Sequence, residues 1–212
     1  MIDRRSFLAA LGGSAAVAPA LRAQGAAAQP SGRSGEWDLA WLDQFKGKHK
    51  QVFDLHSFNL GDDTPLRMVN NYLDTMRDVM HTEGADVNAV VGITRIAFPL
   101  NASDAIWQKY KLGERWKITD PSTGQPSVRN LFTQPNRGGA AISTLQGRGV
   151  LFWQCNMALG GIVQELARAT GQEPAAVRTD LVGGLLPGVK LVPAHTLMVC
   201  LAQERGFTYE KE

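Results

Sequence analysis

The stretch that most constrains the fold is residues 149–160, where a short apolar run passes directly into a helical pattern. Residues 150–154 read as a buried strand, and residues 157–170 have the apolar spacing of an amphipathic helix that ends at Gly171. Cys155 stands between the two. The sequence therefore predicts a strand-to-helix corner with a thiol at its tip.

Four further apolar segments predict strands, at residues 51–57, 86–94, 189–192 and 207–210. Residues 86–94 are almost continuously small or β-branched and apolar, which is typical of a parallel strand covered on both faces. Helical patterns over residues 66–80, 140–146, 157–170, 177–181 and 194–205 alternate with these strands. The alternation predicts a single-domain α/β fold, with a mostly parallel, doubly wound sheet of about five strands flanked by helices.

Residues 1–28 are predicted to be an export signal. Arg4 and Arg5 precede Ser6-Phe7-Leu8, and the weakly apolar run over residues 8–18 has eleven residues, where a membrane span needs about 20. This pattern resembles a twin-arginine export signal, which implies handling by the Tat translocase, removal of the signal, and a periplasmic or secreted protein without a stable membrane anchor. Residues 29–35 are polar and small, and we expect a disordered linker before the domain at residues 36–212.

Charge and composition exclude several classes of protein. The net charge is +2, and residues 1–28 carry all of it, so the remaining chain has no basic bias toward nucleic acid. Two cysteines and four histidines without ligand spacing predict neither a disulfide framework nor a metal site. No glycine-rich nucleotide motif, zinc-protease motif or serine-hydrolase elbow occurs, and we expect no cofactor.

Cys155 is the best candidate for chemistry. Ligands of open α/β sheets collect at the carboxyl ends of the strands, and the start of a helix favours a negatively charged thiolate. The alternative is a buried, inert cysteine. Cys200 lies in the middle of a helical pattern beside Leu197 and Leu201, and we expect it in the core.

Two histidines and two further residues complete the predicted site. His56 ends the first strand, and it would approach Cys155 as a base or cationic partner if strands one and three were neighbours; otherwise it is a solvated loop histidine. His195 begins the last helix at the same sheet edge and is a second candidate. Asn156, next to the cysteine, His195 and Trp107 are candidate binding residues.

Trp107 belongs to a long excursion from the sheet at about residues 95–137. The segment is rich in loop-forming residues but also contains aromatic side chains, which argues against disorder. We interpret it as an insertion that is either a cover over the active edge or a surface embellishment.

Three segments resemble the DsrE/DsrF-like family of sulfur-relay proteins: residues 149–159, which end an apolar strand in cysteine, residues 185–194, with Pro187-Gly188-Val189, and residues 201–209, which close in Gly206-Phe207-Thr208-Tyr209. The resemblance implies that Cys155 can carry sulfur as a persulfide, and that the chain forms a homo-oligomer, as several members do. It favours an exported protein that acts as a thiol-based sulfur carrier or redox protein. The alternative is a non-catalytic module that binds a small molecule or a partner.

Overall fold

The computed structural model of the chain describes residues 37–55, 64–134 and 140–212. Its centre is a sheet of five strands in the order β4-β3-β2-β1-β5, and every pair of neighbours is parallel. This confirms the predicted α/β fold with a parallel sheet. The strands are β1 (His49–Leu55), β2 (Val87–Ile93), β3 (Leu151–Cys155), β4 (Lys190–Val192) and β5 (Thr208–Lys211).

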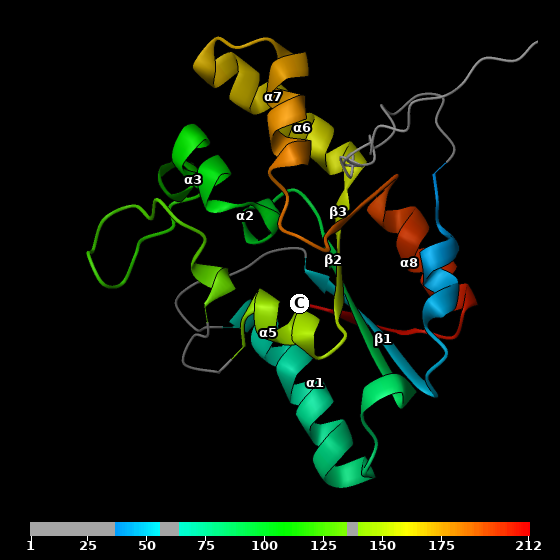
Figure 1. Cartoon of the computed structure of the whole chain (residues 1–212). Coiled ribbons are helices and arrows are strands. Elements are labelled where there is room, and N and C mark those ends of the chain that lie inside the picture. Colours follow the sequence, from blue (N-terminus) through cyan, green and yellow to red (C-terminus); the bar gives the residue numbers. More distant parts are fainter. Residues whose placement is uncertain (1–36, 56–63, 135–139) are drawn as a thin grey trace, which may run out of the picture.

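Helices cover both faces of the sheet, and each face has its own apolar core (Figure 1). Phe53, Val91 and Phe152 face the larger core, while Val52, Val90 and Trp153 face the smaller one, because successive strand residues point to opposite faces. The larger core is covered by α1 (Thr64–Met80), α2 (Phe98–Asn101), α3 (Asp104–Tyr110), α4 (Leu112–Arg115), α5 (Ile142–Gly147), α6 (Asn156–Thr170) and α7 (Pro174–Gly183), with the short 3₁₀ helix η4 (Leu131–Thr133). The smaller core is covered by α8 (His195–Glu204) and the 3₁₀ helix η1 (Ala40–Gln44). A further 3₁₀ turn, η3 (Gly84–Asp86), leads into β2.

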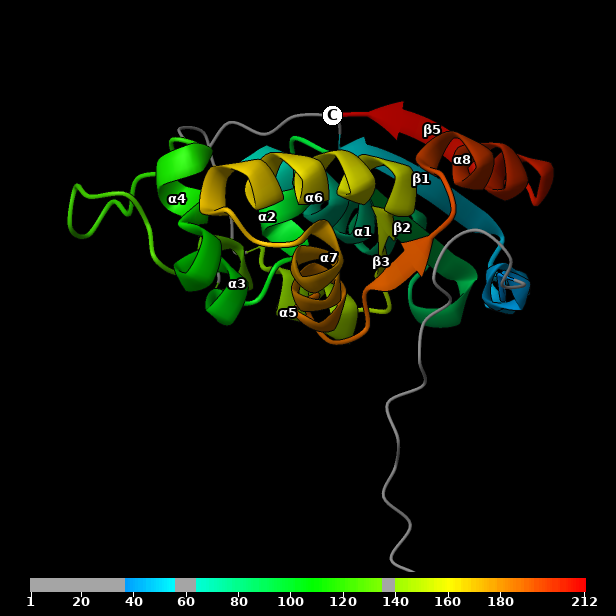
Figure 2. The same ribbon diagram turned by 90° about the horizontal axis from the view of Figure 1, so that it is seen from above.

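The strand order explains why α8 stands apart from the other helices. The chain moves across the sheet in one direction from β1 to β4, so right-handed connections place all the intervening helices on one face. It then returns past β1 to β5, and the same handedness places α8 on the opposite face, beside β1 and β5 (Figure 2). The helix that follows β3, α6, therefore lies on one face of the sheet, and the helix that follows β4, α8, lies on the other. The carboxyl ends of β3 and β4 form the switch point where open α/β sheets bind ligands.

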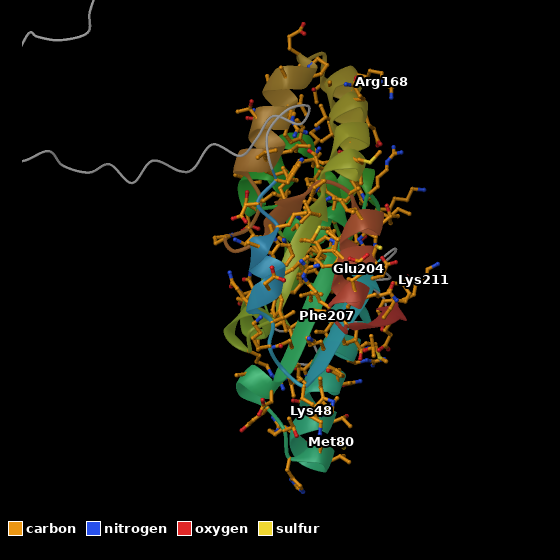
Figure 3. The ribbon with its side chains drawn as sticks, turned by 90° about the vertical axis from the view of Figure 1, so that its right-hand side faces the viewer. Lys48, Met80, Arg168, Glu204, Phe207 and Lys211 are labelled. Carbon is orange, nitrogen blue, oxygen red and sulfur yellow. The ribbon has the colours of Figure 1, made fainter. Side chains whose placement is uncertain are left out.

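The molecule is extended along the strands. Figure 3 shows Arg168, near the end of α6, at one extreme and Met80, at the end of α1, at the other. In Figure 1, α6 and α7 stand beyond the carboxyl ends of the strands. Across the described ranges, no helix combines the length and the apolar character that crossing a membrane requires.

The structure corrects the expected strand order. Strands β1 and β3 are not neighbours, because β2 pairs with both of them. The premise that placed His56 beside Cys155 is therefore wrong. His56 itself, the export signal (1–28) and the linker (29–35) lie outside the described residues.

The excursion that follows β2 is part of the core and not an embellishment. Its described part, residues 95–134, contributes Phe98, Leu100 and Trp107 to the larger core. The Asn101 side chain of α2 donates a hydrogen bond to the Trp153 carbonyl (3.2 Å), so the segment packs against the end of β3. Its buried contacts are on the face opposite α8.

Candidate functional site

Cys155 is the last residue of β3 and the N-cap of α6. Its sulfur accepts a hydrogen bond from the backbone N–H of Ala158 (3.4 Å), the role that a serine or aspartate oxygen usually has at this position. The same sulfur accepts a second hydrogen bond from the backbone N–H of His195 (3.3 Å), the first residue of α8. Residues forty positions apart in the chain thus meet at one sulfur atom.

Two helix N-termini converge on this thiol. The first N–H groups of a helix have no partner within the helix, and its dipole places partial positive charge there. Helix α6 has 15 residues and α8 has 10, so each end presents a developed dipole. Both effects place partial positive charge next to the sulfur. Only 5% of the surface of Cys155 is exposed, so bulk water screens the electrostatic field of the two helix N-termini only weakly at the sulfur.

The imidazole of His195 is held on both sides. The Trp153 indole N–H donates to Nδ1 (3.1 Å), and Nε2 lies 3.0 Å from Asp54 Oδ1. The Tyr209 hydroxyl donates to the other Asp54 oxygen, Oδ2 (2.7 Å). We call Trp153, His195, Asp54 and Tyr209 the histidine anchor.

The anchor has a defined protonation pattern. An indole N–H is only a donor, so Nδ1 of His195 acts as the acceptor and Nε2 carries the proton toward Asp54. The hydrogen bond to Asp54, with burial and the negative charge of Asp54, raises the pKa of Tyr209 to about 12. Tyr209 therefore stays protonated and donates to the carboxylate at neutral pH.

A pocket of about 350 Å³ opens beside the anchor. It is lined by Asp54 of β1, Tyr209 of the edge strand β5, and His195, Thr196, Val199 and Gln203 of α8. Its described lining contains no residue of the 95–134 segment, so that segment does not cover this pocket.

Of the predicted site residues, the structure brings Cys155 and His195 together. Asn156 is adjacent, but its amide oxygen accepts a hydrogen bond from Arg178 of α7 (2.7 Å). Trp107 is 0% exposed and donates its indole N–H to the Pro99 carbonyl (2.9 Å), so the predicted binding role is wrong. His56 lies outside the described residues.

Cys200 departs from its predicted place in the core. It is exposed on α8, and its thiol donates to Glu204 (3.5 Å). That carboxylate raises the pKa of the Cys200 thiol. Both cysteines are free, and Cys200 does not line the pocket beside the anchor.

Three site residues were missed: Asp54, Trp153 and Tyr209. Asp54 interrupts an otherwise apolar strand, and a buried carboxylate in such a run is a usable signal. Tyr209 lies in the closing motif that resembles the DsrE/DsrF-like family. Nothing in the sequence marks Trp153 as a site residue, because a tryptophan in a buried strand is usually part of the apolar core.

The described part of the chain contains no group of three or more histidine, cysteine or acidic side chains arranged to hold a metal ion. No known protein family matches the chain, and no curated protein matches it. A protein of unknown function from Methanobacterium thermoautotrophicum, MTH1491, has a solved structure that is 16% identical with a TM-score of 0.40, covering 77% of this chain and 99% of that one.

Proposed function

We propose that the chain is a thiol-based sulfur carrier or redox protein that works through Cys155. The observation that carries the proposal is the pair of backbone N–H groups, from Ala158 and His195, that converge on one sulfur atom. The position of Cys155 at the sheet's switch point and the resemblance to sulfur-relay proteins support the same conclusion.

The reaction would be a transfer of sulfane sulfur. The Cys155 thiolate attacks the outer sulfur of a persulfide donor, the donor's S–S bond breaks, and the donor leaves as a thiol after taking up the released proton. A new S–S bond forms on Cys155. The outer sulfur keeps its oxidation state through the exchange, so no further oxidant or reductant is required. The two N–H donors stabilise the negative charge before the attack.

The test is mass spectrometry of the purified protein after treatment with iodoacetamide, with and without prior exposure to glutathione persulfide. We expect Cys155 to be alkylated in the folded protein and to gain one sulfur atom from the donor. Cys200→Ser should not change either result. A native Cys155 that is neither alkylated nor loaded with sulfur would contradict the proposal.

The matched knock-out is Cys155→Ser. Serine is a preferred N-cap, so it preserves the hydrogen bond to Ala158 that Cys155→Ala would remove at a cost of about 1 kcal/mol. A loss of sulfur uptake in the serine variant, with unchanged unfolding temperature, therefore reports chemistry rather than fold.

A binding module is the second candidate, favoured by the 350 Å³ pocket. Thr196→Trp would fill the pocket from its exposed rim. Native mass spectrometry of the purified protein would reveal a small molecule that is present in the wild type and absent from this variant. If sulfur transfer persists in Thr196→Trp while such a molecule is lost, the binding role stands independently of the thiol.

We also propose that the chain is exported by the twin-arginine route, which rests on the sequence of residues 1–28. Replacing Arg4-Arg5 by two lysines should retain the protein in the cytoplasm. Fractionation of cells and immunoblotting would measure this, and normal export of the variant would contradict it.

A further inference from the structure

We infer that His195 is a positioning residue for Cys155: Trp153, Asp54 and Tyr209 fix its side chain so that its backbone N–H stays on the cysteine sulfur. The inference rests on the proposed function, because it explains how the thiolate of that site is held. This inference gives a role to the four side chains of the histidine anchor, which the sulfur chemistry does not itself use.

The sheet places the components of the anchor side by side. Asp54 on β1 pairs with Gly92 on β2, and Gly92 pairs with Trp153 on β3. The imidazole spans this row, from the indole at one end to the carboxylate at the other. A Cβ on Gly92 would lie 2.6 Å from His195 Cε1, so the missing side chain makes room for the ring.

Both ring nitrogens of His195 are engaged away from the thiol. Nδ1 accepts from Trp153 and Nε2 faces Asp54, whereas the contact with Cys155 Sγ is made by the main chain. An imidazole in this arrangement cannot take the proton of Cys155 without leaving its partners. The expectation that His195 would act as a base is therefore replaced by a main-chain role.

Fixing the side chain also fixes the start of α8. His195 is the first residue of the helix, where the chain has just turned from the extended Ala194 (φ −151°, ψ 139°). Helix ends fray unless side chains or packing hold them. The contacts of the His195 ring with Trp153 (3.1 Å) and Asp54 (3.0 Å) hold the first turn of α8 against fraying. They therefore keep the backbone N–H of His195 directed at the Cys155 sulfur.

The experiment compares His195→Phe, Asp54→Asn and Tyr209→Phe in a Cys200→Ser background, so that Cys155 is the single thiol. Phenylalanine keeps an aromatic ring over Gly92 but makes neither the hydrogen bond with Trp153 nor the polar contact with Asp54. Asparagine keeps the shape of Asp54 and can still accept from Nε2, and Tyr209→Phe removes one outer hydrogen bond. Leu197→Ala, an exposed change in the same turn of α8, is the control.

Two quantities are measured: the rate of Cys155 alkylation by iodoacetamide from pH 5 to 10, and the hydrogen-exchange rate of the residue 195 amide. For His195→Phe we expect alkylation at pH 7 to slow about tenfold, the value of a lost hydrogen bond to a charged group, with a pH profile of unchanged shape displaced to higher pH. The amide should exchange faster in the same variant. Asp54→Asn and Tyr209→Phe should show smaller effects in the same direction, and Leu197→Ala none.

Wild-type alkylation and amide exchange in His195→Phe would overturn the inference. So would the loss of a separate ionisation from the pH profile of that variant, since that would identify the imidazole as a base. If His195→Phe fails to fold, Tyr209→Phe decides through the same two measurements. Failure of Cys155 to take up sulfur would contradict the proposed function alone, because amide exchange tests the positioning directly.

Discussion

Gly92 sets how closely His195 approaches the sheet. It lies near the carboxyl end of β2, between the Asp54 and Trp153 positions of the neighbouring strands. A Cβ built on it meets His195 Cε1 at 2.6 Å and the Trp153 ring at 2.7 Å, closer than real side chains pack. Both obstacles are buried rings held by hydrogen bonds, so neither can move away cheaply.

Gly92→Ala should therefore damage both the fold and the site. We expect the free energy of unfolding to fall by about 1–3 kcal/mol, as for overpacking in other cores, and Cys155 alkylation to slow because the imidazole is displaced. Chemical denaturation and iodoacetamide kinetics measure the two effects. Gly160→Ala is the control: it lies within α6 with open space around its Cβ, and should stabilise the protein by about 0.5–1 kcal/mol. Equal stabilities for the two variants would show that the contact is not tight.

The two cysteines show which positions could be predicted from the sequence and which could not. Cys155 was placed correctly at the end of a strand, because the change from apolar run to helical pattern is local. Cys200 was placed wrongly, because α8 buries a narrow stripe of His195, Met198 and Ala202 and leaves Leu197 41% exposed. Two leucines beside a cysteine did not reveal which flank of the helix faces the sheet.

At the scale of elements, the 95–134 segment depends on one polar side chain. Asn130 is 2% exposed, and its amide nitrogen donates to the carbonyl groups of Leu100 (2.8 Å) and Ala102 (2.7 Å). Its oxygen accepts from the Phe132 N–H (2.9 Å). The residue thus joins the end of the segment to the turn after α2, which in turn contacts β3 through Asn101.

Asn130→Asp tests this junction without changing the shape of the side chain. The carboxylate cannot donate, so it faces two carbonyl oxygens while buried, and each lost buried hydrogen bond costs about 1–3 kcal/mol. We expect the free energy of unfolding to fall by about 3 kcal/mol in guanidinium denaturation. Asn71→Asp makes the same chemical change at an exposed position of α1, where we expect a change within about 0.5 kcal/mol. Similar losses in both variants would mean that charge, and not the Asn130 contacts, is responsible.

The elements themselves were largely predictable. All five strands lie where apolar runs predicted them, with ends that differ by a few residues. The role of the 95–134 segment was not predictable, because its fold depends on contacts such as those of Trp107 and Asn130, which join positions 8 and 30 residues apart. A loop-like composition concealed the short helices α2 and α4.

At the scale of the whole molecule, strand order is the property that local pattern leaves open. The prediction that strands one and three adjoin failed, since β2 stands between them and β5 takes the other side of β1. This order has a functional consequence: only the return from β4 to β5 places α8 on the second face, and only there can its first N–H reach Cys155. The site is thus a product of topology, and its two halves are not adjacent in sequence.

The same return brings Glu212 against β1, and this gives the whole fold a pH dependence. Its backbone N–H donates to the Asp54 carbonyl (2.9 Å). Burial, together with a hydrogen bond and charge repulsion from Glu210, raises the pKa of the Glu212 side chain to about 7 from 4.5. The folded state therefore binds a proton more tightly than the unfolded chain. The stability from this group is fully present below about pH 4.5 and is lost as the pH rises through about 7.

Glu212→Gln should remove that dependence, since glutamine is neutral at every pH. We expect the melting temperatures of wild type and variant to agree below about pH 4.5, the wild type to fall progressively below the variant as the pH rises from 4.5 to about 7, and the gap to level off at higher pH. Thermal denaturation followed by circular dichroism between pH 4 and 8 measures the difference, in which the contributions of titrating groups remote from Glu212 cancel. Curves that stay parallel over this range would show that Glu212 titrates alike in the folded and unfolded chain.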